Sequence, residues 1–436
     1  MSLSNAFPSV TPSLNLNFIR NNRLDPRITY SRSTTATYVG SDGYIKTAVT
    51  DEPRFEYDSV SLAPRGLLLE GPRTNLVLYS EDFSNADWTK VDTNVTTNIT
   101  AAPSNSLTAD MIVAAATSAQ HQVRKAITLG TSKTYTFSVF AKQASGVYDL
   151  VLAFGANVSG SWDANARASV RFNLLTGVVA ATTQNGNSSH ISSSITPAGN
   201  GWYRCVWTFI PDTTGATAVF GPGMMAIPSG EFAAIPWTGD GTSGVYVWGA
   251  QLEEAYFSSS YIQTTSAEVT RAADDMEITG SNFTPWYNQS GGAFVISSDT
   301  FKADNTANTT NSRIFNLSDG TNDSRYTLLY NTDGGVSMSA AAAAFSASDS
   351  DSGVASKTVQ KVGVNIEAGN SFLTHNGVQV GSTDTGAIVL NYMNRFDIFR
   401  LQTSSDPETS YGWGHIQYLL YYPEPLTVAQ LRTLTK

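Results

Sequence analysis

The sequence predicts an all-β protein in which two antiparallel β-sandwiches come after an irregular N-terminal segment. Apolar and polar residues alternate in runs such as TYTFSVFAK (134–142) and VYVWGAQLE (245–253), which is typical of strands with one buried face. Helical periodicity is nearly absent, and turn-rich connections separate the strands, which favours antiparallel pairing. With 41% hydrophobic and 14% charged residues, the composition fits sheets joined by polar turns.

Length and charge limit the classes of protein that the chain can represent. Its 436 residues exceed what one hydrophobic core usually serves, so we expect two or three domains. A net charge of −10 without any basic stripe argues against nucleic acid as a partner. The N-terminus lacks the blocks of a secretory signal, and no window approaches the ~20 apolar residues that cross a bilayer. We therefore expect synthesis in the cytoplasm and no membrane insertion.

Residues 1–75 form the expected irregular segment, with short strands at Ala36–Val39 and Gly43–Thr47 around the turn SDG. Such a segment buries little by itself, so it should become ordered against another domain or subunit, and GLLLEG (66–71) is the piece expected to dock. Arg54, Arg65 and Arg73 each adjoin a proline or glycine, and their guanidiniums can clamp carboxylates or carbonyls. We expect them to anchor the chain to a neighbouring protein, so that replacing Arg54 and Arg73 by alanine leaves both sandwiches folded.

Residues 76–267 form the first expected sandwich, and 268–292 form a linker, which the polar and acidic stretch Ser266–Gly280 (SAEVTRAADDMEITG) indicates. Cys205 lies in the alternating run WYRCVWTF and should be an inert buried thiol. The strands expected here are Thr134–Lys142, Asp149–Phe154, Ala168–Asn173, Trp202–Ile210 and Val245–Glu253.

Residues 293–436 form the second expected sandwich. Leu373–Val380 reads as a hairpin because the Asn376-Gly377 turn tolerates positive φ. Leu426–Leu434, with Thr427 as its cap, is the one helix that the pattern supports. The expected strands are Ala293–Ser297, Ser312–Leu317, Tyr326–Asn331, Lys361–Glu367, Ser371–His375, Val378–Val380, Phe396–Leu401 and Gly414–Tyr422.

The sequence offers little catalytic material. The four histidines lie far apart, and no GxSxG elbow, P-loop or paired Cys-His signature is present. Adjacent acids such as Asp274 and Asp275 point to opposite faces of a strand, so they cannot flank one glycosidic bond. We therefore expect a protein that is not an enzyme.

Two segments carry a family resemblance. Thr37–Asp58 (TYVGSDGYIKTAVTDEPRFEYD) and Gly66–Trp88 (GLLLEGPRTNLVLYSEDFSNADW) resemble a segment of many tailed-bacteriophage virion proteins. The strand order of 76–267 resembles jelly-roll carbohydrate-binding modules, and that of 293–436 resembles concanavalin A-like lectin and laminin G domains. The resemblance implies a virion protein, in a tail fibre or on the head, which attaches through its N-terminal segment and binds host-surface polysaccharide weakly and multivalently as a homo-oligomer such as a trimer. The alternatives are a capsid decoration or tail-shell protein that binds only virion subunits, and a polysaccharide depolymerase.

Candidate sites follow from side-chain chemistry and from the resemblance. Aromatic rings stack on sugar rings while polar neighbours bond the hydroxyls, so the glycan-binding candidates lie in turn-like contexts; packing under a loop is the alternative for each tryptophan. The glycan candidates are Trp162 with Asp163, Trp237 with Asp240, Trp286 and Trp413. The jelly-roll resemblance also implies a structural calcium ion held by Glu81, Asp82 and Glu253, whose alternative role is that of solvated surface acids.

Overall fold

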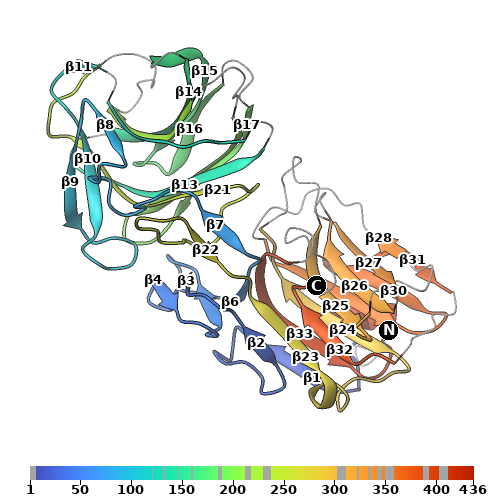
Figure 1. Cartoon of the computed structure of the whole chain (residues 1–436). Helices are drawn as coiled ribbons and strands as arrows, with labels where there is room; N and C mark the ends of the chain where they lie inside the picture. The colour runs from blue at the N-terminus through green and yellow to red at the C-terminus, as the bar shows by residue number, and fades with distance from the viewer. Residues whose placement is uncertain are drawn as a thin grey trace.

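The computed structural model confirms the all-β class and places two β-sandwiches side by side, with the N-terminal residues running between and beneath them (Figure 1). It describes residues 6–119, 121–130, 133–146, 148–158, 161–184, 189–211, 218–228, 237–301, 311–321, 324–331, 335–340, 346–348, 358–385, 392–401 and 411–436.

The first sandwich consists of two antiparallel sheets, each with six described strands. One contains, in spatial order, β17 (Ser189–Pro197), β18 (Tyr203–Ile210), β13 (Tyr135–Gln143), β21 (Gly244–Glu253), β10 (Ala109–Ala114) and β9 (Thr93–Thr100). The other contains β16 (Val178–Gln184), β15 (Ser161–Asn173), β14 (Tyr148–Val158), β19 (Ala218–Pro228), β12 (Gln122–Ala126) and β8 (Thr89–Val91). At one end, β11 (Ser118–Ala119) pairs with β20 (Trp237–Thr238).

Strand β13 shows how the first sandwich buries both of its faces. Phe137 and Val139 point into the core between the two sheets, where Cys205 is also buried as expected. Phe140 has the opposite direction in the strand and packs with Trp248 and Tyr261 in a separate cluster. The outer face of this sheet is therefore covered as well. Trp248 and Tyr261, which belong to this outer cluster, also line the candidate site.

The second sandwich pairs an eight-stranded with a seven-stranded sheet among the described strands. The larger sheet contains, in order, β31 (Val378–Asp384), β30 (Ser371–His375), β29 (Gln360–Ile366), β24 (Gly292–Ser298), β33 (Gly414–Tyr422), β6 (Pro64–Leu69) and β5 (Arg54–Tyr57), with β1 (Leu14–Asn17) also on β33. The smaller contains β2 (Thr29–Ser31), β23 (Asp275–Thr279), β32 (Arg395–Ile398), β25 (Ser312–Ser318), β26 (Arg325–Tyr330), β27 (Val336–Ala340) and β28 (Ser346–Ser348).

The N-terminal segment is not irregular, which corrects the expectation. Its strands β1, β5 and β6 extend one sheet of the second sandwich, and β2 extends the other. The expected docking piece GLLLEG does dock, on β33, where Leu67 and Leu69 enter the shared core. Gly66 is required there, because a Cβ at its φ of +112° would lie 2.3 Å from the Ile416 carbonyl oxygen.

The expected linker is also structured. β22 (Val269–Arg271) pairs with β7 (Arg73–Asn75), β23 lies within a sheet, and the 3-10 helix η2 (Gly280–Asn282) follows it. Residues 268–292 therefore join the second sandwich to the end of the N-terminal segment.

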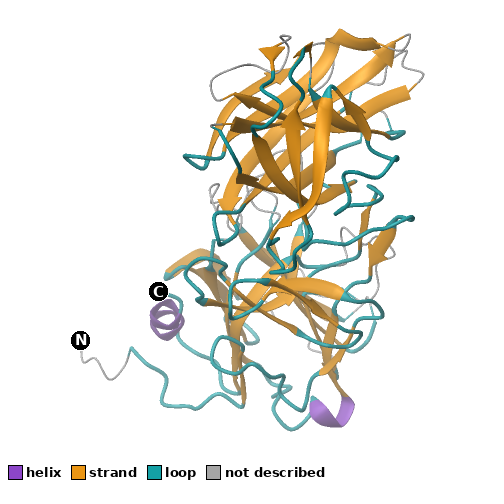
Figure 2. Ribbon diagram, turned by 90° about the vertical axis from the view of Figure 1, so that its left-hand side faces the viewer, coloured by secondary structure: helices purple, strands orange, loops and turns teal. Residues whose placement is uncertain are grey.

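Two local predictions are confirmed. The β30–β31 hairpin turns at Asn376 and Gly377, with φ of 46° and 80°. Helix α2 (Val428–Leu434) begins after Thr427, whose side chain forms a capping box with Gln430. Figure 2 shows α2 and η2 against a molecule otherwise made of strands and loops. Within the described residues, no helix has the length and apolar character needed to cross a membrane.

Candidate functional site

A buried ionic network, formed by Arg32, Arg54, Glu70, Arg271 and Asp274, fixes the N-terminal segment against both sandwiches. The Arg54 guanidinium donates to Glu70 Oε2 at 2.8 Å and to Asp274 Oδ2. Arg32 reaches Asp274 Oδ1 at 3.1 Å, and Arg271 lies 3.5 Å from Glu70. All five side chains are at most 1% exposed.

The network is held in its charged form. Burial opposes ionisation of Glu70, but Arg271, Arg54 and the Ser260 hydroxyl outweigh it and keep the Glu70 pKa well below its usual range. Burial likewise lowers the Arg54 pKa, and Asp274 and Glu70 more than reverse that effect. We call the five residues of this network the joint, because their ion pairs hold the N-terminal segment and the two sandwiches in a fixed arrangement.

The joint positions a hairpin, β3 (Ala36–Val39) with β4 (Ile45–Ala48), below the first sandwich in Figure 1. Arg54 donates to the Thr37 carbonyl at 3.0 Å, and the Thr37 hydroxyl donates to the Tyr261 carbonyl at 2.5 Å. The Ile45 amide donates to the Pro103 carbonyl at 3.0 Å. The hairpin and the first sandwich therefore face each other across a gap, and these hydrogen bonds fix the width of that gap.

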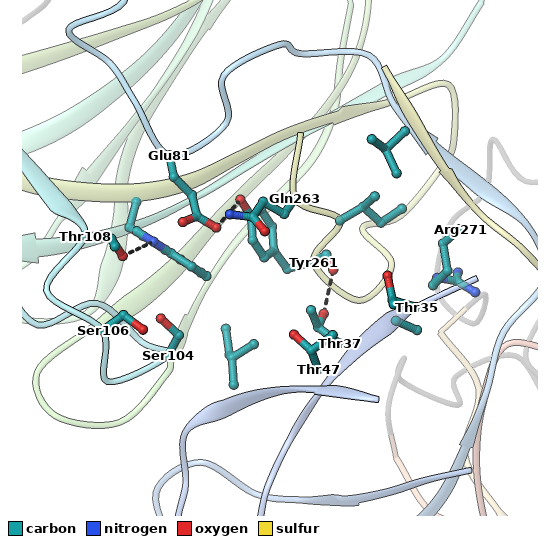
Figure 3. Close-up of a pocket in the computed structure, with 15 residues that line it drawn as sticks. Thr35, Thr37, Thr47, Glu81, Ser104, Ser106, Thr108, Tyr261, Gln263 and Arg271 are labelled. Atoms are coloured by element: carbon teal, nitrogen blue, oxygen red, sulfur yellow. Dashed lines mark hydrogen bonds between the residues drawn. The ribbon is translucent and has the colours of Figure 1, made fainter. Parts of the chain in front are cut away.

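This gap is the candidate site, which we call the first cleft (Figure 3). Its volume is about 340 Å³, within the range of small-ligand sites. The lining is mostly hydroxyl, carboxyl and amide side chains around an aromatic floor. It comprises Thr35, Ala36, Thr37, Ile45, Thr47, Glu81, Ser104, Ser106, Thr108, Trp248, Tyr261, Ile262, Gln263, Val269 and Arg271.

Glu81 and Tyr261 form the polar centre of the first cleft. The Tyr261 hydroxyl donates to Glu81 Oε1 at 3.0 Å, and the Trp248 indole donates to the Thr108 hydroxyl at 3.1 Å, so both rings are fixed in orientation. Figure 3 shows Glu81 and Gln263 converging above the rings. Partial burial raises the pKa of Glu81, and this effect outweighs the hydrogen bonds from Tyr261, Trp248 and Gln263, which lower the pKa.

The cationic group of the first cleft is already engaged. Arg271 donates to the carbonyls of Gly71 and Ala272 at 2.9 and 3.1 Å, besides its contact with Glu70. The groups that remain for a ligand are one carboxylate, several hydroxyls and the Gln263 amide. Such a lining suits a neutral ligand rich in hydroxyl groups, because an anion would face Glu81 without a counter-charge.

The predicted anchor arginines lie largely inside the chain. Arg54 does clamp carboxylates, but they belong to the same chain, and Arg73 is 7% exposed with its guanidinium 4.0 Å from the centre of the Trp413 ring. The expectation that these two face a neighbouring protein is therefore corrected. Arg65 keeps 29% of its side chain exposed and approaches Asp299 at 3.4 Å.

The predicted glycan-binding tryptophans are not gathered into one site. Trp286 is 3% exposed within the core of the second sandwich, and Trp413 is fully buried beneath Arg73 and Phe257, so the prediction is wrong for both. Trp162 and Asp163 lie in β15, but their side chains are outside the described part.

Trp237 and Asp240 are nearer the surface but have other contacts. Trp237 is partly buried with its ring edge against His121, at a centroid distance of 4.5 Å. Asp240 closes its own turn by accepting from the amides of Thr242 and Ser243 at 2.8 and 2.7 Å. Sugar binding by this pair stays a prediction.

The predicted calcium ligands have separate partners. Glu81 faces the first cleft, Asp82 accepts from Ser84 at 2.7 Å, and Glu253 accepts from the Ser259 amide at 3.1 Å inside the protein. Within the described ranges, no group of three or more His, Cys, Asp or Glu side chains could hold a metal ion.

Sequence reasoning missed most of the first cleft. Its Ser and Thr residues come from two stretches of the chain, 35–47 and 104–108, and such residues are common throughout this sequence. Only Glu81 was singled out, as a metal ligand. The resemblance segment that contains the hairpin was the one available signal.

No family model and no curated protein matches the chain. Among solved structures, the Ruminococcus gnavus IT-sialidase CBM40 bound to α2,3-sialyllactose matches with 17% identity and a TM-score of 0.29, covering 34% of this chain and 83% of that one. A SAP-like pentraxin of Limulus polyphemus matches with 15% identity and a TM-score of 0.27, covering 34% and 70%. Trypanosoma rangeli sialidase in complex with sialic acid matches with 11% identity and a TM-score of 0.28, covering 75% and 60%. At these TM-scores the likenesses carry no argument about ligand or activity.

Proposed function

We propose that the chain is a structural, non-catalytic protein of a tailed-phage particle that binds neutral host-surface polysaccharide at the first cleft. The observation that carries the binding proposal is the chemistry of that cleft. Hydroxyl and amide groups, together with the Glu81 carboxylate, surround the oriented rings of Tyr261 and Trp248. Polysaccharide hydroxyls both donate and accept hydrogen bonds, so they match this lining.

The expected affinity of one site is low. Tyr261 and Trp248 are 3% and 2% exposed, so they form a floor and do not offer a broad stacking surface. Several copies of the chain on one particle raise the effective affinity without a tighter site. This reasoning favours a homo-oligomer, of which a trimer is one form.

The virion role rests on the resemblance of Thr37–Asp58 and Gly66–Trp88, and the structure changes how attachment would work. Because Arg54 and Arg73 are buried, we assign particle contact to the outer surface of the N-terminal segment. Val49, Val60 and Leu62 are 61%, 61% and 46% exposed there, and exposed aliphatic side chains are common in protein interfaces. The protein would be made in the host cytoplasm and incorporated into the virion.

Calorimetric titration with neutral oligosaccharides (maltohexaose, cellohexaose and mannohexaose) tests the binding proposal. Glu81→Gln should weaken the binding of any active oligosaccharide about tenfold or more and Thr47→Ala about fivefold, because a hydrogen bond to a charged group contributes roughly 1.5–3 kcal/mol and a neutral one about 1. The matched controls are Glu424→Gln and Thr97→Ala, at exposed positions outside the first cleft. Equal affinity in all four variants would refute the site.

Two further experiments separate the alternative functions. Labelled antibody on purified particles should mark a tail appendage, whereas an even distribution over the head would favour a decoration protein that binds only virion subunits. Incubation with host capsule or lipopolysaccharide should leave the polysaccharide intact. Release of oligosaccharide would establish a depolymerase and overturn the non-catalytic assignment.

A further inference from the structure

A second cleft lies on the other side of the β3–β4 hairpin, where the hairpin, the first sandwich and the second sandwich meet. Its volume is about 400 Å³. Thr37 and Ile45 line both clefts, so the hairpin separates them. Sites at domain junctions are common places for small ligands.

The acids that line the second cleft are already satisfied. Glu70 is paired with Arg54 at 2.8 Å. Glu56 accepts from His415 at 2.7 Å and from the Val39 amide at 3.1 Å. Asp58 accepts from the amides of Val60 and Ser61 at 3.1 and 2.8 Å. These carboxylates therefore need no cation from a ligand.

The two arginines of the second cleft differ from each other. Arg65 has Asp299 at 3.4 Å, whereas no acid in the described part of the chain pairs with Arg204 within 4.0 Å. Arg204 donates from Nη2 to the Ser138 hydroxyl at 3.1 Å and lies 5.4 Å from the centre of the Phe140 ring. Its Nε atom is buried without a hydrogen-bond partner.

The Arg204 guanidinium therefore carries a positive charge that no carboxylate in the described part of the chain neutralises at close range. Burial lowers the pKa of Arg204, and the more distant acids Glu253, Glu70 and Glu56 oppose that effect. Arginine stays charged in proteins, so the uncompensated group can only be satisfied by an anion or by water. A planar carboxylate fits a guanidinium with two parallel hydrogen bonds.

We propose that the second cleft binds the carboxylate of an acidic sugar, a hexuronate, through Arg204. The sugar ring would lie among groups of mixed character, since Tyr38 and Ser258 offer hydroxyls while Pro197 and Phe301 offer apolar surface. Its binding group, Arg204, and its ligand class differ from those of the first cleft, although Thr37, Ile45 and Tyr261 line both. The proposal therefore goes beyond the proposed function and can fail or succeed independently of it.

Matched sugars test the proposal on the intact protein. D-galacturonate and D-glucuronate differ from D-galactose and D-glucose only in the carboxylate, and acetate supplies the carboxylate without the sugar. In calorimetric titration at low ionic strength, at least one hexuronate should bind at least tenfold more tightly than its neutral partner, and acetate should bind more weakly than that hexuronate. Added salt should weaken the binding.

Variants assign the effect to Arg204. Arg204→Gln should abolish the preference for the hexuronate, Arg204→Lys should retain part of it, and Arg23→Gln, an equal charge change at an exposed position, should leave it intact. An unchanged preference in Arg204→Gln would overturn the site. Should that variant fail to fold, the unmodified protein still decides: equal affinity for hexuronate and neutral sugar overturns the proposal, and acetate binding as tightly as hexuronate overturns the assignment of a sugar.

Discussion

Arg54 and Asp274 form a fully buried ion pair although 220 residues separate them in the sequence. Arg54 begins strand β5 of the N-terminal segment, and Asp274 lies just before β23 of the second sandwich. Glu70 and Arg271 complete the joint beside β7 and β22, which connect both regions to the first sandwich. The N-terminal segment is thus part of the scaffold that holds the two sandwiches and both clefts together.

Arg54→Ala should destabilise the protein by about 3–5 kcal/mol, because it leaves Glu70 and Asp274 buried without their common cation. Denaturant unfolding followed by circular dichroism measures the change, and the exposed Arg23→Ala serves as the control. Unaltered stability of Arg54→Ala would show that the segment is a detachable anchor, as the sequence alone suggested.

Trp413→Ala should act on stability and not on sugar binding. The indole is fully buried between Arg73 and Phe257, so its removal leaves a cavity that costs about 3–5 kcal/mol. The midpoint temperature of thermal unfolding should fall, while the variant in its folded state keeps the oligosaccharide affinity of the unmodified protein. Lower affinity at unchanged stability would restore Trp413 as a binding residue.

The contribution of His415 to stability should depend on pH. His415 is 1% exposed and lies between Asp299 Oδ2 at 3.0 Å and Glu56 Oε2 at 2.7 Å, with Arg65 at 3.4 Å from the same Asp299. Burial lowers the His415 pKa, but Asp299 and Glu56 together raise it above its usual value of 6.5. For both acids, burial is outweighed by the contacts with His415, which lower their pKa values from 3.8 and 4.5.

A raised histidine pKa gives stability that is complete below pH 6.5 and is lost as the pH rises through the folded-state value. Lowered carboxyl pKa values give stability that is lost as the pH falls below the usual values of 3.8 and 4.5. The stability advantage of the unmodified protein over His415→Gln should therefore be largest between about pH 4.5 and 6.5 and should shrink at alkaline pH. Thermal unfolding across pH 4 to 10 measures this difference, and an advantage that grows at alkaline pH would contradict the assignment.

Cys205 should report global unfolding. Its thiol is fully buried in the first sandwich, and burial raises its pKa, so both access and thiolate formation are suppressed. We expect a thiol reagent such as dithionitrobenzoate to react only under denaturing conditions. Stoichiometric reaction of the native protein within minutes would place the thiol at an opening segment of the sandwich.

Local sequence patterns predicted the elements whose causes are local. Alternation located β13 and β21, the Asn376-Gly377 pair located a hairpin turn, and the Thr427 cap located the single α-helix of the described chain. These features depend on residues within a few positions of one another.

Long-range pairing could not be predicted in this way. Leu67 pairs with Ile416 in the sheet, and the sequence around either residue contains no signal that identifies its partner. The turn-like surroundings of Trp286 and Trp413 suggested exposure, yet distant segments cover both rings. The first cleft is built from scattered Ser and Thr residues that become a site only when the hairpin meets the first sandwich.

Hydrogen exchange of the backbone amides, with and without a saturating neutral oligosaccharide, tests the central claim most directly. The account predicts protection of residues 35–47, 104–108 and 261–263, which line the first cleft, when a member of the neutral panel binds. Protection confined to other segments, or the absence of any binder in the panel, would contradict it.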